Sequence, residues 1–391
     1  MKKIISILLM LAMVAAMFCG CTGNNDSDNS SDTIKIGIFE PASGSNGAGG
    51  KQESLGVKYA NYVTPTVDID GKTYNIELVS VDNASSNDKA PTAAAELVNA
   101  GVSVVLGSYG SGVSIAASSV FQQAGIPAIG ITCTNPQVTE GNEHYFRICF
   151  LDPFQGKVLA NYAFNELGYR KAYTLAESGN DYDEGLAYYF TEAFKALGGS
   201  VENANFPENT ADFNSYITNA ANSGAEVIFA PTSTNYAQLI IEQVAAKNIN
   251  ATLMAGDTWD SNLVLAAAKG KNVKIDITTF YQEGGNPEFD ADFKAWLESD
   301  QQNITDNGGN SIVAANPVMG YDAYNVAVEA IKIAKSADPK AIMNALKEVD
   351  YTGVTGRIVF NETGDADRTS AYIKSANTET GLWDFVKEQG V

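Results

Sequence analysis

Two hydroxyl-rich segments of the chain could bind a small polar molecule. The apolar run Val102–Leu106 leads into the segment GSYGSG, which contains Ser111, and the apolar run Ile126–Ile131 leads into Thr132–Cys133–Thr134. Hydroxyl and backbone N–H groups donate hydrogen bonds, and the first turn of a helix favours an anion such as a carboxylate. Residues of these types indicate a binding site rather than a catalytic one.

The spacing of the apolar residues predicts that these two segments lie side by side. Each apolar run is short and rich in β-branched residues, which is typical of a buried strand. From Val113 the apolar residues follow a helical spacing, and the hydroxyl residues just before it, Ser111 among them, are candidate N-caps. Ligands of open α/β sheets bind at the carboxyl ends of parallel strands. We therefore expect Ser111 and Thr134 at one edge of a sheet.

Strand-like and helical segments alternate along the chain, beginning with the strand-like Thr33–Phe39. A Gly/Ser loop, EPASGSNGAGG, follows this segment, and the apolar spacing then predicts a helix over Gln52–Tyr62. Such alternation predicts a parallel sheet covered by helices. The pattern breaks near residues 151–153 and 279–283, which separates two units. The predicted fold class is therefore α/β, with two doubly wound parallel-sheet lobes.

Composition and missing motifs argue against several classes of function. The formal net charge is −21 at pH 7, which argues against nucleic acid as a partner because phosphates need a basic surface. The single histidine, His144, argues against histidine-dependent triads and zinc sites. The chain has no dinucleotide-binding, P-loop or Gly-x-Ser-x-Gly motif. We expect no catalysis, cofactor or metal, and a secreted hydrolase or ligase is the alternative from the enzyme class.

The N-terminus predicts export from the cytoplasm. Two lysines precede the short apolar stretch Ile4–Phe18, which is typical of a signal peptide over residues 1–20 and is too short to span a membrane well. The stretch resembles a bacterial lipoprotein signal, which implies that Cys21 carries a lipid and anchors the protein outside the cell membrane. Residues 21–32 are polar and predict a flexible tether. Plain secretion without a lipid is the alternative.

Cys133 and Cys149 are the only possible internal disulfide pair of the exported chain. Their spacing does not decide whether they are bonded. We expect two free thiols.

A succession of segments resembles the branched-chain amino-acid-binding type of solute-binding protein. The segments are IKIGIFEPASG, VSVVLGSYGSGVS, GIPAIGITCTNPQVTEG, HYFRICFLDPFQG, NDYDEGLA and TGRIVF. The resemblance covers the chain from about residue 33 to the C-terminus. It implies a type I periplasmic-binding fold, in which two lobes joined by three hinge crossovers close over a small solute.

The resemblance also implies where the lobes divide. The first lobe would comprise residues 33–152 and 283–349, and the second lobe residues 153–282 and 350–391. The hinge crossovers would lie near residues 151–153, 279–283 and 349–355.

The same resemblance implies roles for individual residues. Ser111 would bind the α-carboxylate of the ligand, and the next strand end would supply two further ligand contacts, the backbone carbonyl of Cys133 and the hydroxyl of Thr134. Tyr182 would close over the ligand from the second lobe, and Asp257 would bind the α-ammonium group.

Tyr109 and Trp259 are further candidate ligand contacts, since both aromatic residues lie beside these positions. The chain departs from the family pattern at Gly49, where the family often has an aromatic residue, and at Ser233–Thr234, near another such position. These departures affect the side-chain specificity more than the recognition of an α-amino acid.

The resemblance implies an extracytoplasmic receptor that binds a branched-chain or related amino acid and delivers it to an ABC permease. We expect it to act as a monomer. The first alternative is the same clamp binding an amide, urea or an aromatic acid. The second alternative is a sensor rather than a transport receptor.

Overall fold

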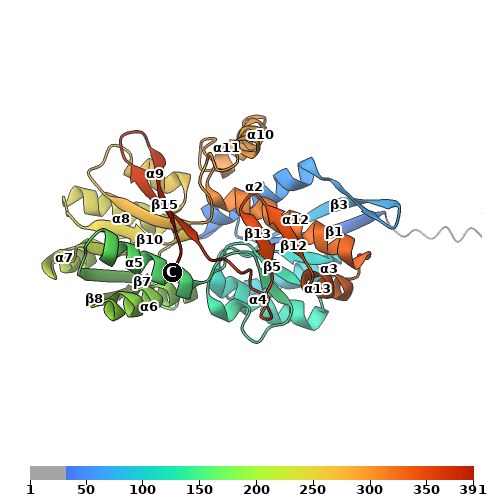
Figure 1. Ribbon diagram of the computed structural model, residues 1–391, viewed down its shortest axis with the longest axis horizontal. Helices are drawn as coiled ribbons and strands as arrows, with labels where there is room; N and C mark the ends of the chain where they lie inside the picture. Colours follow the sequence, from blue (N-terminus) through green and yellow to red (C-terminus); the bar gives the residue numbers. More distant parts are fainter. Residues whose placement is uncertain (1–31) are drawn as a thin grey trace, which may run out of the picture. The chain divides into compact units, whose positions relative to one another are not determined.

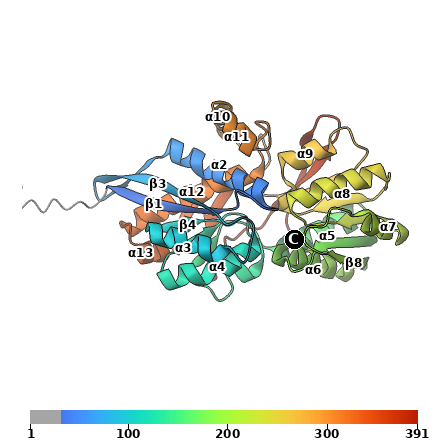
Figure 2. The same cartoon turned by 180° about the vertical axis from the view of Figure 1, so that it is seen from behind.

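The computed structural model describes residues 32–391. The predicted signal peptide, the lipid-bearing Cys21 and the predicted tether up to residue 31 lie outside the described residues. Residues 33–391 contain two large sheets, and Figures 1 and 2 show the elements of each sheet gathered in a separate lobe.

The first lobe contains a six-stranded sheet in the order β2-β3-β1-β4-β5-β6. All neighbours pair in parallel except the edge strand β2, which is antiparallel to β3. The strands are β1 (Thr33–Glu40), β2 (Thr66–Ile69), β3 (Lys72–Asp82), β4 (Val104–Leu106), β5 (Ala128–Gly130) and β6 (Tyr145–Arg147). The helices of this lobe are α2 (Gly47–Val63), α3 (Ala90–Ala100), α4 (Ser111–Ala124), η1 (Pro136–Val138), α10 (Pro287–Glu298), α11 (Gln301–Asp306), α12 (Ala315–Ala334) and α13 (Pro339–Leu346).

The second lobe contains a seven-stranded sheet in the order β15-β14-β11-β10-β9-β7-β8. The strands β7 to β11 are parallel, and the C-terminal strands β14 and β15 are antiparallel additions at one edge. The strands are β7 (Lys171–Glu177), β8 (Ser200–Phe206), β9 (Val227–Phe229), β10 (Thr252–Ala255), β11 (Ile275–Thr279), β14 (Ala371–Asn377) and β15 (Leu382–Gln389). The helices are α5 (Asp152–Asn161), η2 (Tyr162–Glu166), α6 (Asp181–Ala196), α7 (Asn214–Asn222), α8 (Thr234–Ala246), η3 (Asp257–Trp259) and α9 (Asn262–Ala268).

Alternating side chains bury both faces of each sheet. In β1, Ile36 and Ile38 face the core made with α2 and α12, whereas Phe39 faces α3 and α4 and meets Phe121 edge-to-face. In β9, Phe229 faces α6 and Ile228 faces α8. Burial of both faces is why these strands read as continuous apolar runs. The structure confirms the predicted α/β fold with parallel-rich sheets.

The chain passes between the sheets three times. The first two passages follow β6 and β11, and Phe150 and Phe280 in these passages stack with ring centroids 4.1 Å apart. The hairpin of β12 (Asp350–Gly353) and β13 (Gly356–Val359) packs on α12 of the first lobe. The backbone N–H of Val354 in this hairpin donates a hydrogen bond to Asp322 of α12, which holds the hairpin on the first lobe. The third passage therefore lies after Phe360, later than the predicted residues 349–355.

Helix α2 begins inside the predicted Gly/Ser loop. Its first turn contains Gly47, Gly49 and Gly50, all buried. A Cβ atom at Gly50 would lie 2.4 Å from the carbonyl oxygen of Pro41, so glycine is required for close approach rather than for flexibility. Glycine lowers helix propensity, and tertiary packing overrides it here.

Two further results concern cysteine and membrane association. Cys133 and Cys149 are free and buried, as expected. Within residues 32–391, no helix combines the length and the apolar character that crossing a bilayer requires.

Candidate functional site

The predicted hydroxyl residues follow the neighbouring ends of β4 and β5. The two strands pair in parallel. Ser111 is the first residue of α4, and its Oγ accepts a hydrogen bond from the backbone N–H of Asn135 at 3.3 Å. The structure therefore brings Ser111 beside the segment that carries Thr134. The prediction of Ser111 as N-cap is wrong, because Gly110 holds the non-helical N-cap position and Ser111 is already helical.

Thr134 is buried beside the start of α5. Its carbonyl oxygen accepts a hydrogen bond from the backbone N–H of Asp152 at 3.0 Å, and its hydroxyl oxygen has no hydrogen-bond partner within the described residues. Burial raises the pKa of Asp152 to about 7, although the nearby Thr134 hydroxyl and the Arg147 guanidinium lower it. An unpartnered hydroxyl and a carboxyl group with a raised pKa thus lie close together.

The carbonyl of Cys133 is held by Arg147, whose Nη1 donates to it at 3.0 Å. The same guanidinium donates to the carbonyl oxygens of Asn135 and Pro136, and its Nε pairs with Asp365 Oδ1 at 2.5 Å. Arg147 therefore fixes the backbone of the segment that carries Thr134. The expected contact between the Cys133 carbonyl and a ligand stays a prediction, since Arg147 binds this carbonyl in the structure.

In the second lobe, Asp257 and Tyr182 contact each other. Tyr182 Oη donates to Asp257 Oδ1 at 3.0 Å. Gln155 Nε2 donates to the same oxygen at 2.7 Å, and Gln155 Oε1 accepts from the backbone N–H of Asp257 at 3.0 Å. Burial, followed by the charge of Asp152, raises the pKa of Asp257 well above its ordinary value.

The two lobes contact each other directly at these residues. Tyr109 Oη of the first lobe donates to the carbonyl oxygen of Thr258 at 3.4 Å. Asn135 Nδ2 donates to the carbonyl oxygen of Asp181 at 2.7 Å. These contacts join the segments that carry Ser111 and Thr134 to the segments that carry Asp257 and Tyr182.

Tyr109 occupies the space that a side chain at Gly49 would need. A Cβ atom at Gly49 would lie 2.3 Å from Tyr109 Cζ. A larger side chain at position 49 would therefore collide with the Tyr109 ring.

We expect Gly49→Ala to lower the free energy of unfolding by about 1–3 kcal/mol, because the added methyl group overpacks the Tyr109 ring. Urea unfolding followed by circular dichroism measures the change. Gly47→Ala is the matched control, since its Cβ would lie 3.4 Å from the nearest atom in the same helix. Equal losses in the two variants would contradict the steric account, and adding Tyr109→Leu to Gly49→Ala should recover part of the loss.

Trp259 lies in the core of the second lobe. Its side chain is fully buried, and its indole N–H donates to the carbonyl oxygen of Thr232 at 3.1 Å. This placement favours a packing role over ligand contact. Ser233 Oγ is buried without a hydrogen-bond partner within the described residues, and Thr234 Oγ1 donates to the carbonyl oxygen of Thr258 at 3.4 Å.

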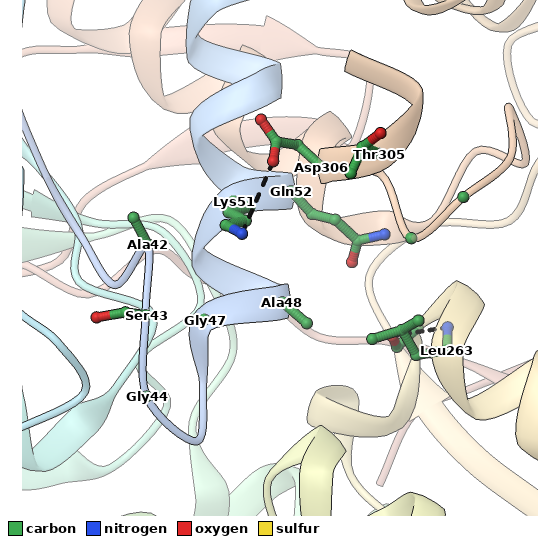
Figure 3. A pocket seen from close by; sticks show the side chains of 13 residues that line it. Ala42, Ser43, Gly44, Gly47, Ala48, Lys51, Gln52, Leu263, Thr305 and Asp306 are labelled. Atoms are coloured by element: carbon green, nitrogen blue, oxygen red, sulfur yellow. Dashed lines mark hydrogen bonds and ion pairs between the residues drawn. The ribbon is translucent and has the colours of Figure 1, made fainter. Parts of the chain in front are cut away.

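A cavity of about 530 Å³ lies at the start of α2 (Figure 3). Lys51 and Asp306, which form an ion pair at 3.8 Å, line it together with Gln52. The cavity is not lined by Ser111, Thr134 or any other predicted ligand residue. In residues 32–391, no cluster of three or more His, Cys, Asp or Glu side chains is arranged to hold a metal ion.

Four polar residues of the site were not predicted from the sequence: Asp152, Gln155, Glu40 and Glu53. Asp152 and Gln155 lie in the quoted segment HYFRICFLDPFQG, where the Asp-Pro pair indicates only a chain break. Glu40 ends β1 and directly follows the predicted strand Thr33–Phe39, which is the same local signal that points to the hydroxyl residues. Glu53 carries no local signal, because an acidic residue in a helix is usually exposed.

Comparisons with known proteins agree on one family. The family model described as periplasmic binding protein matches residues 33–378. The chain is 30% identical over 338 residues to Leu/Ile/Val-binding protein homolog 1 of Brucella suis biovar 1, covering 85% of this chain and 87% of the relative.

Two solved structures give the same result. The leucine-binding protein LivK of Thermotoga maritima matches with a TM-score of 0.80 and 27% identity, covering 91% of this chain and 99% of the other. LivJ of Streptococcus pneumoniae, solved in complex with isoleucine, matches with a TM-score of 0.77 and 26% identity, covering 92% and 99%.

Proposed function

Because the chain belongs to the periplasmic binding protein family, we propose that it is the receptor of an ABC importer for a branched-chain or related α-amino acid. The first lobe binds the α-carboxylate, and the second lobe binds the α-ammonium group. Members of this family are solute receptors rather than enzymes, act outside the cytoplasm and work with ABC permeases.

Ser111 and Thr134 provide the carboxylate end of the proposed site. Ser111 lies in the first turn of α4, where free backbone N–H groups and the helix dipole favour an anion. The Thr134 hydroxyl is buried without a partner, and an unsatisfied buried polar group is costly. A ligand carboxylate would accept a hydrogen bond from each residue and relieve this cost.

Asp257 provides the ammonium end of the proposed site. Gln155 and Tyr182 both donate to Oδ1, which leaves Oδ2 for the ligand. The carboxyl group is buried, so an ammonium group beside it would favour its ionised form. The proposal is supported by the hydrogen bonds between the lobes from Tyr109 to Thr258 and from Asn135 to Asp181, which join the segments that carry Ser111 and Thr134 to those that carry Asp257 and Tyr182.

Attachment to the membrane and the oligomeric state belong to the same proposal. A lipid on Cys21 would hold the receptor at the outer surface of the cell membrane, near its permease. Closure of a single chain over one solute needs no second copy, so we propose a monomer.

One observation favours a second candidate, in which the clamp binds an amide or urea. The Asp152 carboxyl group lies beside Thr134, where the first proposal places a ligand carboxylate. A neutral amide would avoid repulsion there, whereas a carboxylate requires Asp152 to be protonated.

A thermal-shift screen separates the two candidates. A ligand at about 100 times its dissociation constant stabilises the folded protein by about 2.7 kcal/mol, which raises the melting temperature. We expect leucine, isoleucine, valine or a related amino acid to raise it. A shift with amides or urea and none with amino acids would favour the second candidate.

A further inference from the structure

We propose that Glu40 and Glu53 form a carboxyl pair that shares a proton and positions the two loops of the proposed binding site. The inference rests on the proposed function, because these loops carry Ser111 and Thr134. Both glutamates are positioning residues that act on the ligand through the loops.

The two glutamates lie at the carboxyl edge of the first sheet. Glu40 is the last residue of β1, and Glu53 lies in the second turn of α2. Their exposed fractions are 2% and 0%. A Cβ atom at Gly107 would lie 2.3 Å from Glu40 Oε1, so this carboxyl group packs against the start of the GSYGSG segment.

Each carboxyl group holds one of the binding loops. Glu40 Oε2 accepts a hydrogen bond from the backbone N–H of Tyr109 at 2.7 Å. Glu53 Oε1 accepts a hydrogen bond from the hydroxyl of Thr132. Tyr109 and Thr132 each lie two residues before the proposed ligand-binding residue of their loop. The pair therefore ties both loops to β1 and α2.

The two remaining oxygens require a proton between them. Glu40 Oε1 and Glu53 Oε2 are buried and receive no hydrogen bond from any other described residue. The two carboxyl groups interact closely enough for Glu53 to raise the pKa of Glu40, and a proton held by Glu40 would give both oxygens a hydrogen-bond partner. Burial raises the pKa of both groups, that of Glu53 to about 7, so at least one proton stays on the pair at neutral pH.

Within residues 32–391, the groups that shift the pKa of Glu40 and Glu53 include no cation, and the buried Arg147 acts on the neighbouring Cys133 instead. The titratable groups that face it are the Cys133 thiol, the Tyr109 and Tyr145 phenols and the Asp257 carboxyl group. Helix α12, which packs on α2, presents the uncharged Asn316. Loss of the last proton would place two adjacent negative charges between the loops, and their repulsion would displace Tyr109 and Thr132.

Glu53→Gln tests the proposal because a glutamine amide reproduces the protonated pair without a proton to lose. Its oxygen can accept from Thr132, and its nitrogen can donate to Glu40. With L-leucine as the probe, we expect the variant to match the wild type near neutral pH. At alkaline pH, once the last proton leaves the pair, the wild type should bind at least about tenfold more weakly than the variant.

The wild type and Glu53→Gln are compared at the same pH, so that the titration of the leucine ammonium group affects both measurements equally. Glu53→Ala should bind more weakly at every pH, because it releases the Thr132 loop. Glu242→Gln, a surface substitution whose side chain is 58% exposed, is the control and should follow the wild type.

A second readout needs no ligand. An acid whose pKa is raised in the folded state stabilises the protein at low pH and loses that contribution as pH rises from its ordinary value towards the raised one. The free energy of unfolding of the wild type should therefore fall with rising pH relative to Glu53→Gln.

If the free energies of unfolding of the wild type and of Glu53→Gln changed with pH in the same way, the proposed carboxyl pair would be overturned. Equal losses of affinity in Glu53→Gln and Glu53→Ala at every pH would also overturn it, because Glu53 would then bind the ligand through its charge. If leucine fails to bind to any variant, that result counts against the proposed function alone, and the stability profile decides the fate of the pair.

Discussion

Asp257→Ala is expected to weaken amino acid binding by two to three orders of magnitude or more. The substitution leaves the ligand ammonium group unpaired in a closed, buried site, and an unpaired buried charge costs roughly 3–5 kcal/mol. Each 1.4 kcal/mol corresponds to about a tenfold change in affinity. Isothermal titration calorimetry measures the change directly, and a loss of less than about threefold would remove Asp257 from the site.

Asp257→Asn separates the charge from the packing. Asparagine keeps the shape of the side chain, and its oxygen can still accept hydrogen bonds from Gln155 and Tyr182. A loss of affinity as large as that of Asp257→Ala would therefore assign the effect to the charge. Because burial raises the pKa of Asp257 without ligand, binding of an ammonium group should release a proton. Titrations in buffers of different ionisation enthalpy detect this release, and its absence would contradict pairing of Asp257 with an ammonium group.

Arg147→Ala is expected to lower the free energy of unfolding by about 3–5 kcal/mol, because it leaves the buried Asp365 carboxylate without its partner. The guanidinium is fully buried and also holds the carbonyl groups of Cys133 and Asn135. The variant should therefore bind ligand more weakly as well. Urea unfolding of the ligand-free protein measures the stability, and calorimetry measures the affinity.

Arg357→Ala is the matched control for this pair. Arg357 and Asp350 approach to 2.6 Å, but their side chains are 66% and 57% exposed, and solvent-exposed ion pairs contribute little to stability. Similar losses for Arg147→Ala and Arg357→Ala would contradict the role of burial. Arg147→Met combined with Asp365→Leu should cost less than Arg147→Ala, since no charge is then left buried alone.

The sequence predicts site residues whose signal is local. Ser111 and Thr134 lie in the segments that follow two apolar strands, and the parallel pairing of β4 and β5 brings Ser111 beside the segment that carries Thr134. The roles of Tyr182 and Asp257 come from the family resemblance, and the structure places these residues in contact. The family and fold implied by the resemblance are confirmed by the comparisons.

Residues whose role depends on tertiary contacts could not be predicted in this way. Glu53 looks like an exposed helical acid, and only the packing of α2 against the end of β5 buries it beside Thr132. The Tyr109 ring packs against Gly49, which lies in a segment far from it in the chain. Trp259 follows a strand end as the hydroxyl residues do, but its large apolar ring is buried in the core.

Parts of the fold were missed for a similar reason. Strands β2, β8, β12 and β15 escaped prediction because many of their side chains are partly exposed, and they lack a continuous apolar run. Helix α2 begins among glycines that weaken the local helical signal. In each case neighbouring strands or helices stabilise a segment whose own sequence only weakly indicates its secondary structure.

A crystal structure with the amino acid that gives the largest thermal shift tests the central claim most directly. We expect its carboxylate at Ser111 and Thr134 and its ammonium group at Asp257, between the two lobes. A ligand bound in the cavity beside Lys51 and Asp306, or bound with its carboxylate at Asp257, would contradict the account.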